Sequence, residues 1–360
     1  MAIFPKFSPT TVRRELTIFL LAVFLIPMFL PLLVVLYIFS LIAQKFAILL
    51  AKIFRSDLSH ILAEHGVMFT LEHIYRRPKV NAVCYYICDG TVPLDHLRRQ
   101  FEQRIINYCD DHGNLKYRKL RQTWTQFSGF MFWKWERNFD LNNHVRMYDY
   151  TEPELALLSP CTENDLKRLA RTLISKPYVK GRSPWEIMVI PDYEYVDSSD
   201  GKTRIGSVLT LRIHHGLADG LSIAKMWYQL FNQEFIFPAT TFPQLSLPMK
   251  ALQFTTQVLK FPYDLAQLMV LSRDGPHSWH VMDKKLSRSY HVFASDRIPT
   301  SIIKTIKNKY RVGYNTVVYA VTAGAISRLM TQAGQEVPKV ITCMVPYPLA
   351  NHPGGLVNHA

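Results

Sequence analysis

Seven consecutive residues, His-His-Gly-Leu-Ala-Asp-Gly at positions 214–220, combine two imidazoles, a carboxylate and two glycines. Neighbouring residues on an extended segment point to opposite faces, so His214 and His215 cannot both face one ligand. We therefore predict that one imidazole faces a cavity and that the other is packed behind it. A neutral imidazole, with a pKa of about 6.5, suits a general base that takes a proton from a hydroxyl attacking a carbonyl. Adjacent strand histidines chelate poorly and the sequence contains no His-Glu-x-x-His, so we predict no metal site.

The flanking sequence predicts a strand, a turn and a helix around these residues. Residues 205–213 are dense in apolar side chains, as in a largely buried strand. Asp219 then occupies the N-cap position, and Gly216 and Gly220 permit close backbone approaches. A packed histidine pair beside an ordinary capped helix is the plainer alternative, but it leaves the full seven-residue pattern unexplained. The stripe of an amphipathic helix follows at Ile223, Met226, Trp227, Leu230 and Phe231.

The pattern His-His-x-x-x-Asp-Gly resembles the HHxxxDG motif of the CoA-dependent acyltransferase and peptide-condensation superfamily. Further segments resemble the wax ester synthase/diacylglycerol O-acyltransferase (WS/DGAT) family, and their order around the motif narrows the resemblance to that family. They are Phe-Asp-Leu-Asn-Asn-His-Val-Arg at 139–146, Arg-Ser-Pro-Trp-Glu at 182–186, Tyr-Asn-Thr-Val at 314–317, and Val-Pro-Tyr-Pro at 345–348 followed by 355–359.

Two departures from the family pattern affect what is carried over. Thr316 stands where the family's Asn-Asp-Val motif has Asp, so we assign that carboxylate's role to no residue here. Asn315 and Trp185 are kept as candidates for lining the substrate channel. The chain ends at Ala360, where family members continue through a second acyltransferase half, so we expect a fragment or a truncated isoform.

The resemblance implies an α/β fold of two chloramphenicol-acetyltransferase-like halves. Each half would be a sheet covered by helices, with a channel between the halves and the second half incomplete. We divide the chain into an N-terminal membrane anchor at 1–56, a first half with the motif at 57–235, a crossover linker at 236–289 and a truncated second half at 290–360.

The implied function is that of a membrane-bound O-acyltransferase in triacylglycerol or wax ester biosynthesis. It would move a fatty acyl group from acyl-CoA, a co-substrate, to a long-chain alcohol or diacylglycerol, without a bound cofactor. His215 would be the general base, His214 would support the turn, Asp219 would hold the loop, and Gly220 would allow a close approach of helix to strand. Two alternatives stay open: another HHxxxDG acyltransferase, or a non-catalytic membrane-bound fragment that binds acyl-CoA or lipid.

The charge balance of 42 Lys+Arg against 28 Asp+Glu gives a net +14. This charge suits an anionic membrane surface or the phosphates of CoA, with an ordinary basic surface as the alternative. We see no zinc-finger spacing, basic helix or RNP-type segment, so nucleic acid is not an expected partner. The five scattered cysteines exclude a regular disulfide framework, and no Asn-x-Ser/Thr sequon occurs. Both observations favour a catalytic region in the reducing cytosol.

Residues 16–44 form an uncharged, strongly apolar run flanked by Arg13, Arg14 and Lys45. The run exceeds the roughly 20 residues that span a bilayer and lacks the cleavage site of a secretory signal. It predicts a retained membrane anchor, at the endoplasmic reticulum or a lipid-droplet surface. Pro27 and Pro31 predict either a kinked span or a re-entrant hairpin.

Hydrophobic periodicity predicts the remaining elements. Strands are expected at 80–88, 185–191 and 290–294, helices at 94–109, 165–176, 300–310 and 315–333, a polar turn at 197–202, and an amphipathic piece at 252–271 broken at Pro262.

Overall fold

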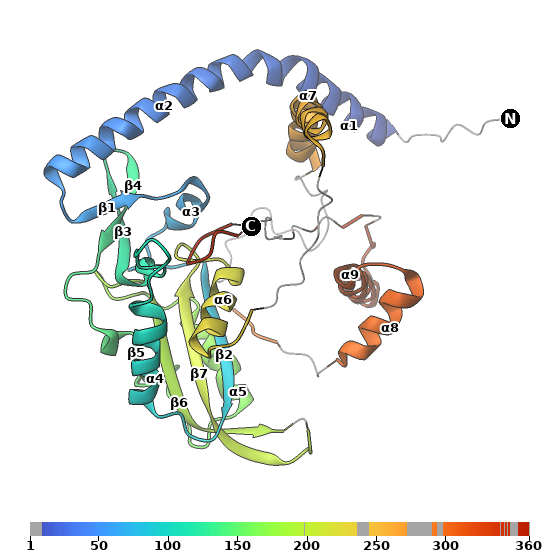
Figure 1. The fold of residues 1–360 in the computed structure, drawn as a ribbon. Helices are drawn as coiled ribbons and strands as arrows, with labels where there is room; N and C mark the ends of the chain where they lie inside the picture. Colours follow the sequence, from blue (N-terminus) through green and yellow to red (C-terminus); the bar gives the residue numbers. More distant parts are fainter. Residues whose placement is uncertain are drawn as a thin grey trace. The chain divides into compact units, whose positions relative to one another are not determined.

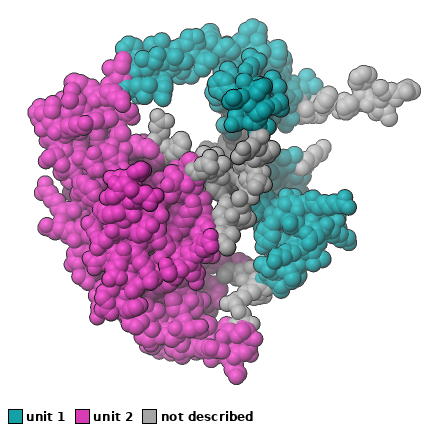
Figure 2. Space-filling view, viewed as in Figure 1, with its two compact units in different colours: residues 1–41, 239–286, 294–345 teal, residues 42–238, 287–293, 346–360 magenta. Residues whose placement is uncertain are grey.

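The computed structural model describes residues 9–197, 199–235, 245–271, 290–293, 298–338, 340, 341, 343, 345 and 352–359. The chain forms two compact units, coloured separately in Figure 2. One comprises residues 1–41, 239–286 and 294–345, and the other comprises residues 42–238, 287–293 and 346–360. The HHxxxDG turn lies in the second of these.

One continuous helical run occupies residues 9–54. It consists of α1 (Pro9–Leu20), the π-helical turn η1 (Leu21–Leu25) and α2 (Ile26–Phe54) (Figure 1). The hairpin alternative is wrong, because the run passes through both prolines without turning back. The fixed φ of proline fits a helix, and each proline removes only one backbone hydrogen bond.

The same run contains a possible membrane span. The segment Val12–Phe54 has a mean hydropathy of 3.0 in its most apolar window, of which only 11% is buried. Within the described part of the chain, it is the one helix long and apolar enough to cross a bilayer.

Three more helices belong to the first unit. They are α7 (Leu247–Leu271), α8 (Thr300–Tyr310) and α9 (Tyr314–Gln332), and the last two confirm the predicted helices. The predicted break in α7 is wrong, because the helix accommodates Pro262 and packs its buried Ala266 against Ile18 and Ala22. The predicted strand at 290–294 is also wrong for residues 290–293, which pair with no described strand, while Ala294 lies outside the described residues.

The second unit is built on two sheets, which confirm an α/β fold. A three-stranded antiparallel sheet has the order β1-β4-β3, and a four-stranded sheet has the order β2-β7-β6-β5. In the larger sheet β5 runs parallel to β6, and the other neighbours are antiparallel. The strands are β1 (Leu58–Ile61), β2 (Asn81–Asp89), β3 (Gln122–Phe127), β4 (Phe130–Trp135), β5 (Val145–Met147), β6 (Trp185–Val196) and β7 (Thr203–His214).

Helices cover both faces of the four-stranded sheet (Figure 1). On one face lie α4 (Leu94–Phe101), continued by the π-helical η3 (Glu102–Ile106), and α6 (Gly220–Leu230). On the other face lies α5 (Glu163–Leu173). The central strand β7 is therefore buried on both sides, which explains its dense apolar sequence. Short helical pieces are α3 (Glu64–Val67), η2 (Met68–Thr70), η4 (Arg118–Arg121) and η5 (Leu141–Asn143).

The predicted elements of this unit are confirmed with shifted ends. The strand expected at 185–191 extends to Val196, because β6 and β7 form a long hairpin that pairs up to Val196 and Thr203. Its turn is closed by the Asp197 N–H, which donates to the Lys202 carbonyl at 2.9 Å. The helix expected to reach 109 ends at Ile106.

Candidate active site

The HHxxxDG turn connects the end of β7 to the start of α6, as the sequence predicts. His214 is the last residue of β7, and Gly220 is the first residue of α6. Asp219 is the N-cap: its Oδ1 accepts a hydrogen bond from the Ser222 N–H at 2.7 Å. The turn therefore holds the two histidines between a rigid strand and a capped helix.

His214 is fully buried and engaged at both ring nitrogens. Its Nε2 lies 2.5 Å from Glu72 Oε1, and its Nδ1 accepts from the Gly216 N–H at 2.9 Å. Because Nδ1 is an acceptor, the ring proton resides on Nε2 and is donated to Glu72. Burial lowers the pKa of His214, although Glu72 acts in the opposite direction. This imidazole is the one packed behind the turn.

His215 is partly exposed and has a different environment. Its ring stacks on Phe69 with the centroids 4.2 Å apart. Its Nδ1 lies 3.0 Å from Asn358 Oδ1, and its backbone N–H donates to the Val80 carbonyl at 2.8 Å. Among the described residues, no hydrogen bond engages Nε2 of His215. That nitrogen is therefore available to a hydroxyl.

The two glycines of the turn differ in what surrounds them. A Cβ at Gly216 would meet side-chain atoms of His214 and Thr70 at 3.0 Å and of Trp124 at 3.1 Å. A Cβ at Gly220 would meet nothing within 4 Å, and Gly220 is exposed. The described part of the structure shows no close approach at Gly220, and the tightly packed glycine of the turn is Gly216, which is surrounded by side chains.

Asp219 also binds the C-terminal segment 352–359. Its Oδ2 accepts from the His359 N–H at 2.8 Å, and its own N–H donates to the Val357 carbonyl at 2.8 Å. Burial raises the pKa of Asp219, but the N–H donors of Ser222 and His359 outweigh burial, so the net pKa lies below its usual value. The loop-holding geometry expected of Asp219 thus extends to a distant segment of the chain.

A pocket of about 460 Å³ opens beside the turn. Gly216, which follows His215, and Asn358, which bonds to it, both line this pocket. Lys119 lines it as well, and burial followed by the charge of Arg118 lowers the pKa of Lys119 to about 8. The apolar part of the wall includes Ile61, Leu62 and Trp133. The pocket thus combines an apolar wall with one cation, and it reaches the candidate base through Gly216 and Asn358, since His215 itself is not in its lining.

Trp185 does not line this pocket, and its place in a substrate channel stays a prediction. It is buried at the start of β6, stacks on His144 at 4.5 Å, and donates its indole N–H to the Leu120 carbonyl at 2.8 Å. In the described structure its ring belongs to the main hydrophobic core. Asn315 is exposed near the start of α9 in the other unit, so its channel role stays a prediction.

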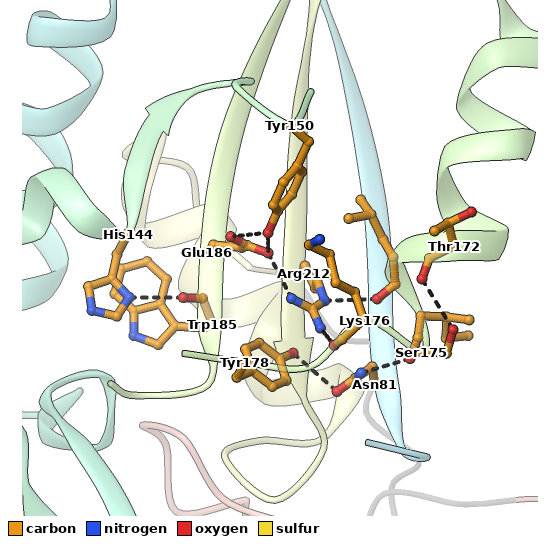
Figure 3. A network of polar contacts seen from close by, with 12 residues as sticks. Asn81, His144, Tyr150, Thr172, Ser175, Lys176, Tyr178, Trp185, Glu186 and Arg212 are labelled. Atoms are coloured by element: carbon orange, nitrogen blue, oxygen red, sulfur yellow. Dashed lines mark hydrogen bonds and ion pairs between the residues drawn. The ribbon is translucent and has the colours of Figure 1, made fainter. Parts of the chain in front are cut away.

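A buried ion pair fixes the strand that carries the motif. Figure 3 shows Arg212 between Glu186 and Tyr178. Arg212 Nη1 donates to Glu186 Oε1 at 2.9 Å, and its Nε donates to the Leu173 carbonyl at 2.8 Å. The pair joins directly opposite positions on β6 and β7, two residues before His214. Paired and hydrogen-bonded in this way, the buried guanidinium locks the register of β7 against β6.

Sequence reasoning missed three residues at the site: Glu72, Lys119 and Asn358. Glu72 and Lys119 lie far from the motif in sequence and belong to no pattern that marks them. Asn358 was within the segment 355–359 that resembles a family element, but nothing local shows that it contacts His215. As for metals, no group of three or more His, Cys, Asp or Glu side chains in the described ranges could hold an ion.

Comparison with known protein families shows which family the motif region resembles. Residues 89–259, which include the motif, match the family model described as "Wax ester synthase/diacylglycerol acyltransferase catalytic domain". This segment of the chain therefore resembles the WS/DGAT catalytic domain. No curated protein matched the sequence.

Several solved structures are similar to the chain. The first condensation domain of the CDA synthetase has 14% identity and a TM-score of 0.43, over 78% of this chain and 63% of that one. The X-domain from teicoplanin biosynthesis has 14% identity and a TM-score of 0.33, over 57% and 40%. Polyketide synthase associated protein 5 from Mycobacterium tuberculosis has 18% identity and a TM-score of 0.29, over 50% and 33%. The chain therefore spans 33–63% of the length of these three structures.

Proposed function

We propose that this chain is a membrane-bound O-acyltransferase that transfers a fatty acyl group from acyl-CoA to a long-chain alcohol or diacylglycerol. The WS/DGAT match supports the reaction class. The observation that carries the proposal is the contrast between the two motif histidines. His214 is sealed in the core, whereas His215 is partly exposed beside a pocket and has Nε2 available.

In the proposed reaction His215 acts as a general base. Its Nε2 takes the proton of the acceptor hydroxyl while the oxygen attacks the thioester carbonyl carbon and forms a C–O bond. The tetrahedral intermediate collapses, the C–S bond breaks, and the imidazolium returns its proton to the departing thiolate. The products are the ester and free CoA, so the histidine ends each cycle in its starting protonation state.

The pocket lining suits the co-substrate on chemical grounds. Its apolar wall fits an acyl chain, and the Lys119 ammonium fits an anionic group of the acyl-CoA. Lys119 also lines a second pocket, of about 550 Å³, together with Lys116 and Arg118. In this proposal, part of the chain's positive net charge attracts the anionic groups of the co-substrate to these pockets.

Membrane attachment is the second part of the proposal. The apolar helix within residues 12–54 would anchor the chain at the endoplasmic reticulum or a lipid-droplet surface, with the catalytic unit in the cytosol. The proposal includes a division of the chain into four parts. These are an anchor at 1–56, a first half at 57–235, a linker at 236–289 and a second half at 290–360. The channel between two halves remains part of this proposal.

An acyl-transfer assay tests the function. Membranes containing the full chain are incubated with labelled palmitoyl-CoA and, in separate reactions, hexadecanol, a diacylglycerol or a short-chain alcohol. We expect labelled wax ester or triacylglycerol with the two long-chain acceptors. Binding of palmitoyl-CoA without any ester would contradict the proposal and favour a non-catalytic acyl-CoA binder. Ester formation confined to the short-chain alcohol would point instead to a different HHxxxDG enzyme.

A further inference from the structure

The segment 352–359 is held firmly where it passes the motif. Val357 N–H donates to Ser222 Oγ at 3.1 Å, the Val357 carbonyl accepts from Asp219 N–H at 2.8 Å, and His359 N–H donates to Asp219 Oδ2 at 2.8 Å. Leu356 is buried in the main core of the unit. The backbone on both sides of Asn358 is thus fixed by the N-cap and the first turn of the motif helix.

The side chain of Asn358 then contacts His215 twice. Its Nδ2 donates to the His215 carbonyl at 3.0 Å, and its Oδ1 lies 3.0 Å from the His215 ring Nδ1. A carbonyl oxygen can only accept, so the amide nitrogen must face the His215 carbonyl and the amide oxygen must face the ring. Because the amide oxygen also only accepts, the proton of a neutral His215 ring must lie on Nδ1.

The neighbouring histidine has the opposite arrangement. His214 Nδ1 accepts from the Gly216 N–H, so its proton lies on Nε2. Two adjacent imidazoles are therefore held in opposite tautomers by different partners. Only the tautomer of His215 places a lone pair on the nitrogen left available for a substrate.

We propose that Asn358 is a positioning residue that fixes His215 in the tautomer with an unprotonated Nε2 and sets the direction of its ring. Asn358 acts through His215 and performs no proton transfer itself. This inference rests on the proposed function, in which Nε2 receives the hydroxyl proton. A neutral imidazole with its proton on Nε2 would be unable to accept there.

Three substitutions separate this role from simple structural support. Asn358→Leu keeps the size of the side chain and removes both contacts. Asn358→Asp keeps an acceptor for Nδ1–H and adds a charge that stabilises the imidazolium. Leu356→Ala is the control, because it weakens the packing of the same segment without touching His215.

The first readout is ¹⁵N NMR of protein with labelled histidine, in which the His215 signals are assigned with His215→Gln. We expect the parent to have a protonated Nδ1 and an unprotonated Nε2. We expect Asn358→Leu to lose that preference and Leu356→Ala to keep it. An unprotonated Nδ1 in the parent, or an unchanged spectrum in Asn358→Leu, would overturn the inference.

The second readout is steady-state acyl transfer. We expect Asn358→Leu to lower kcat by at least about 10-fold with little change in KM, as for loss of a group that orients another. Asn358→Asp should recover much of kcat and move the acid limb of the kcat/KM profile to higher pH. If Asn358→Leu does not fold, the Asp variant's pH shift decides, and a profile identical to the parent's counts against the inference.

The two proposals fail in different ways. If His215→Ala abolishes transfer while Asn358→Leu leaves both kcat and the tautomer unchanged, the positioning role is wrong and the proposed function stands. If Asn358→Leu changes the tautomer while His215→Ala leaves transfer intact, the positioning geometry stands and the proposed base is wrong.

Discussion

At the scale of single residues, identical side chains acquire different chemistry from their partners. His214 is closed off by Glu72 and by the Gly216 N–H, whereas His215 meets Phe69 and Asn358 and keeps Nε2 available. The alternation of faces on an extended segment predicts that the two rings diverge. It does not predict what each ring meets, because those partners come from residues far away in the sequence.

Lys119 gives a prediction in which stability and binding move in opposite directions. Burial holds its pKa at about 8, so keeping the ammonium charged at neutral pH costs stability. We expect Lys119→Met to melt at a higher temperature than the parent at pH 7. Its KM for acyl-CoA should rise about 10-fold, because a charge-assisted contact to an anionic group is lost.

The pH dependence provides the control for Lys119. The parent loses this charge as the pH rises through about 8, so its KM should approach that of Lys119→Met by pH 9. The stability cost should also lessen between about pH 8 and the normal lysine value of about 10.4, because there the unfolded chain binds more protons. Parallel KM profiles for the two proteins from pH 7 to 9 would refute the assignment.

Asp219 combines capping with attachment of the C-terminal segment. Asp219→Ala should lower stability by about 1 kcal/mol or more through loss of the cap, and should lower activity as well. Since the folded pKa lies below its usual value, this stabilisation is complete above about pH 4 and is lost only as the pH falls through the lowered pKa. Urea unfolding of parent and variant from pH 7 to 3 measures the difference.

Asp140→Ala is the matched control for Asp219. Asp140 is likewise an N-cap, and its carboxylate accepts a hydrogen bond from the Asn142 N–H at 2.9 Å. It caps η5 rather than the motif helix. It should leave acyl transfer unchanged. An Asp219→Ala protein that loses turnover while unfolding like the parent would speak against the structural role.

At the scale of elements, the strand–turn–helix around the motif follows from local sequence. Apolar density predicts β7, and helical spacing with an N-cap predicts α6. The sequence does not predict which glycine of the turn is closely packed. The close packing is caused by Thr70 and Trp124, which belong to other elements. The glycine that needs space is Gly216, and the sequence alone treats it like Gly220.

The two glycines therefore make a matched pair for mutation. Gly216→Ala should lower the free energy of unfolding by about 1–3 kcal/mol, because the new Cβ enters packed side chains. Gly220→Ala should leave it unchanged or raise it by up to about 1 kcal/mol, because alanine favours the helix and the space is open. Urea denaturation measures both, and equal losses in the two variants would contradict this account of the turn.

The elements that sequence patterns assigned wrongly have a common physical cause. Residues 290–293 have the composition of a strand, but no described strand pairs with them. Pro262 looks like a helix break, but α7 continues through it and packs on α1. In both cases the outcome depends on tertiary partners, which local propensity does not contain.

At the scale of the whole molecule, the chain joins a strongly apolar helix to the α/β unit that carries the HHxxxDG motif. The surroundings of the helical run change along its length. Ala47 and Ala51, near its end, pack on Phe132 in the α/β unit, whereas the earlier apolar side chains are largely exposed. Length and composition predict this helix well, because a bilayer span needs only a continuous apolar stretch. They do not decide between a re-entrant hairpin and a single kinked span.

Deleting residues 1–41 should detach the chain from lipid. The deletion removes most of the apolar run at 16–44 and keeps Ala47 and Ala51, which pack on the α/β unit. In a vesicle flotation assay the parent should rise with the vesicles, and the deletion variant should stay in the dense fraction. Replacing Val34 and Val35 with lysine controls for length, because charge at the centre of a span is costly. Flotation of both variants like the parent would show that another part of the chain binds the membrane.

The central claim is that His215 accepts the proton of the acceptor hydroxyl. Removing the His215 imidazole tests this claim most directly. Transfer of labelled acyl-CoA to long-chain alcohol and diacylglycerol is compared between His215→Ala and His96→Ala, a control at an exposed position on α4. We predict that His215→Ala lowers kcat/KM by about 100-fold or more while it melts like the parent, and that His96→Ala keeps full activity. Full ester formation by a folded His215→Ala protein would contradict the mechanism.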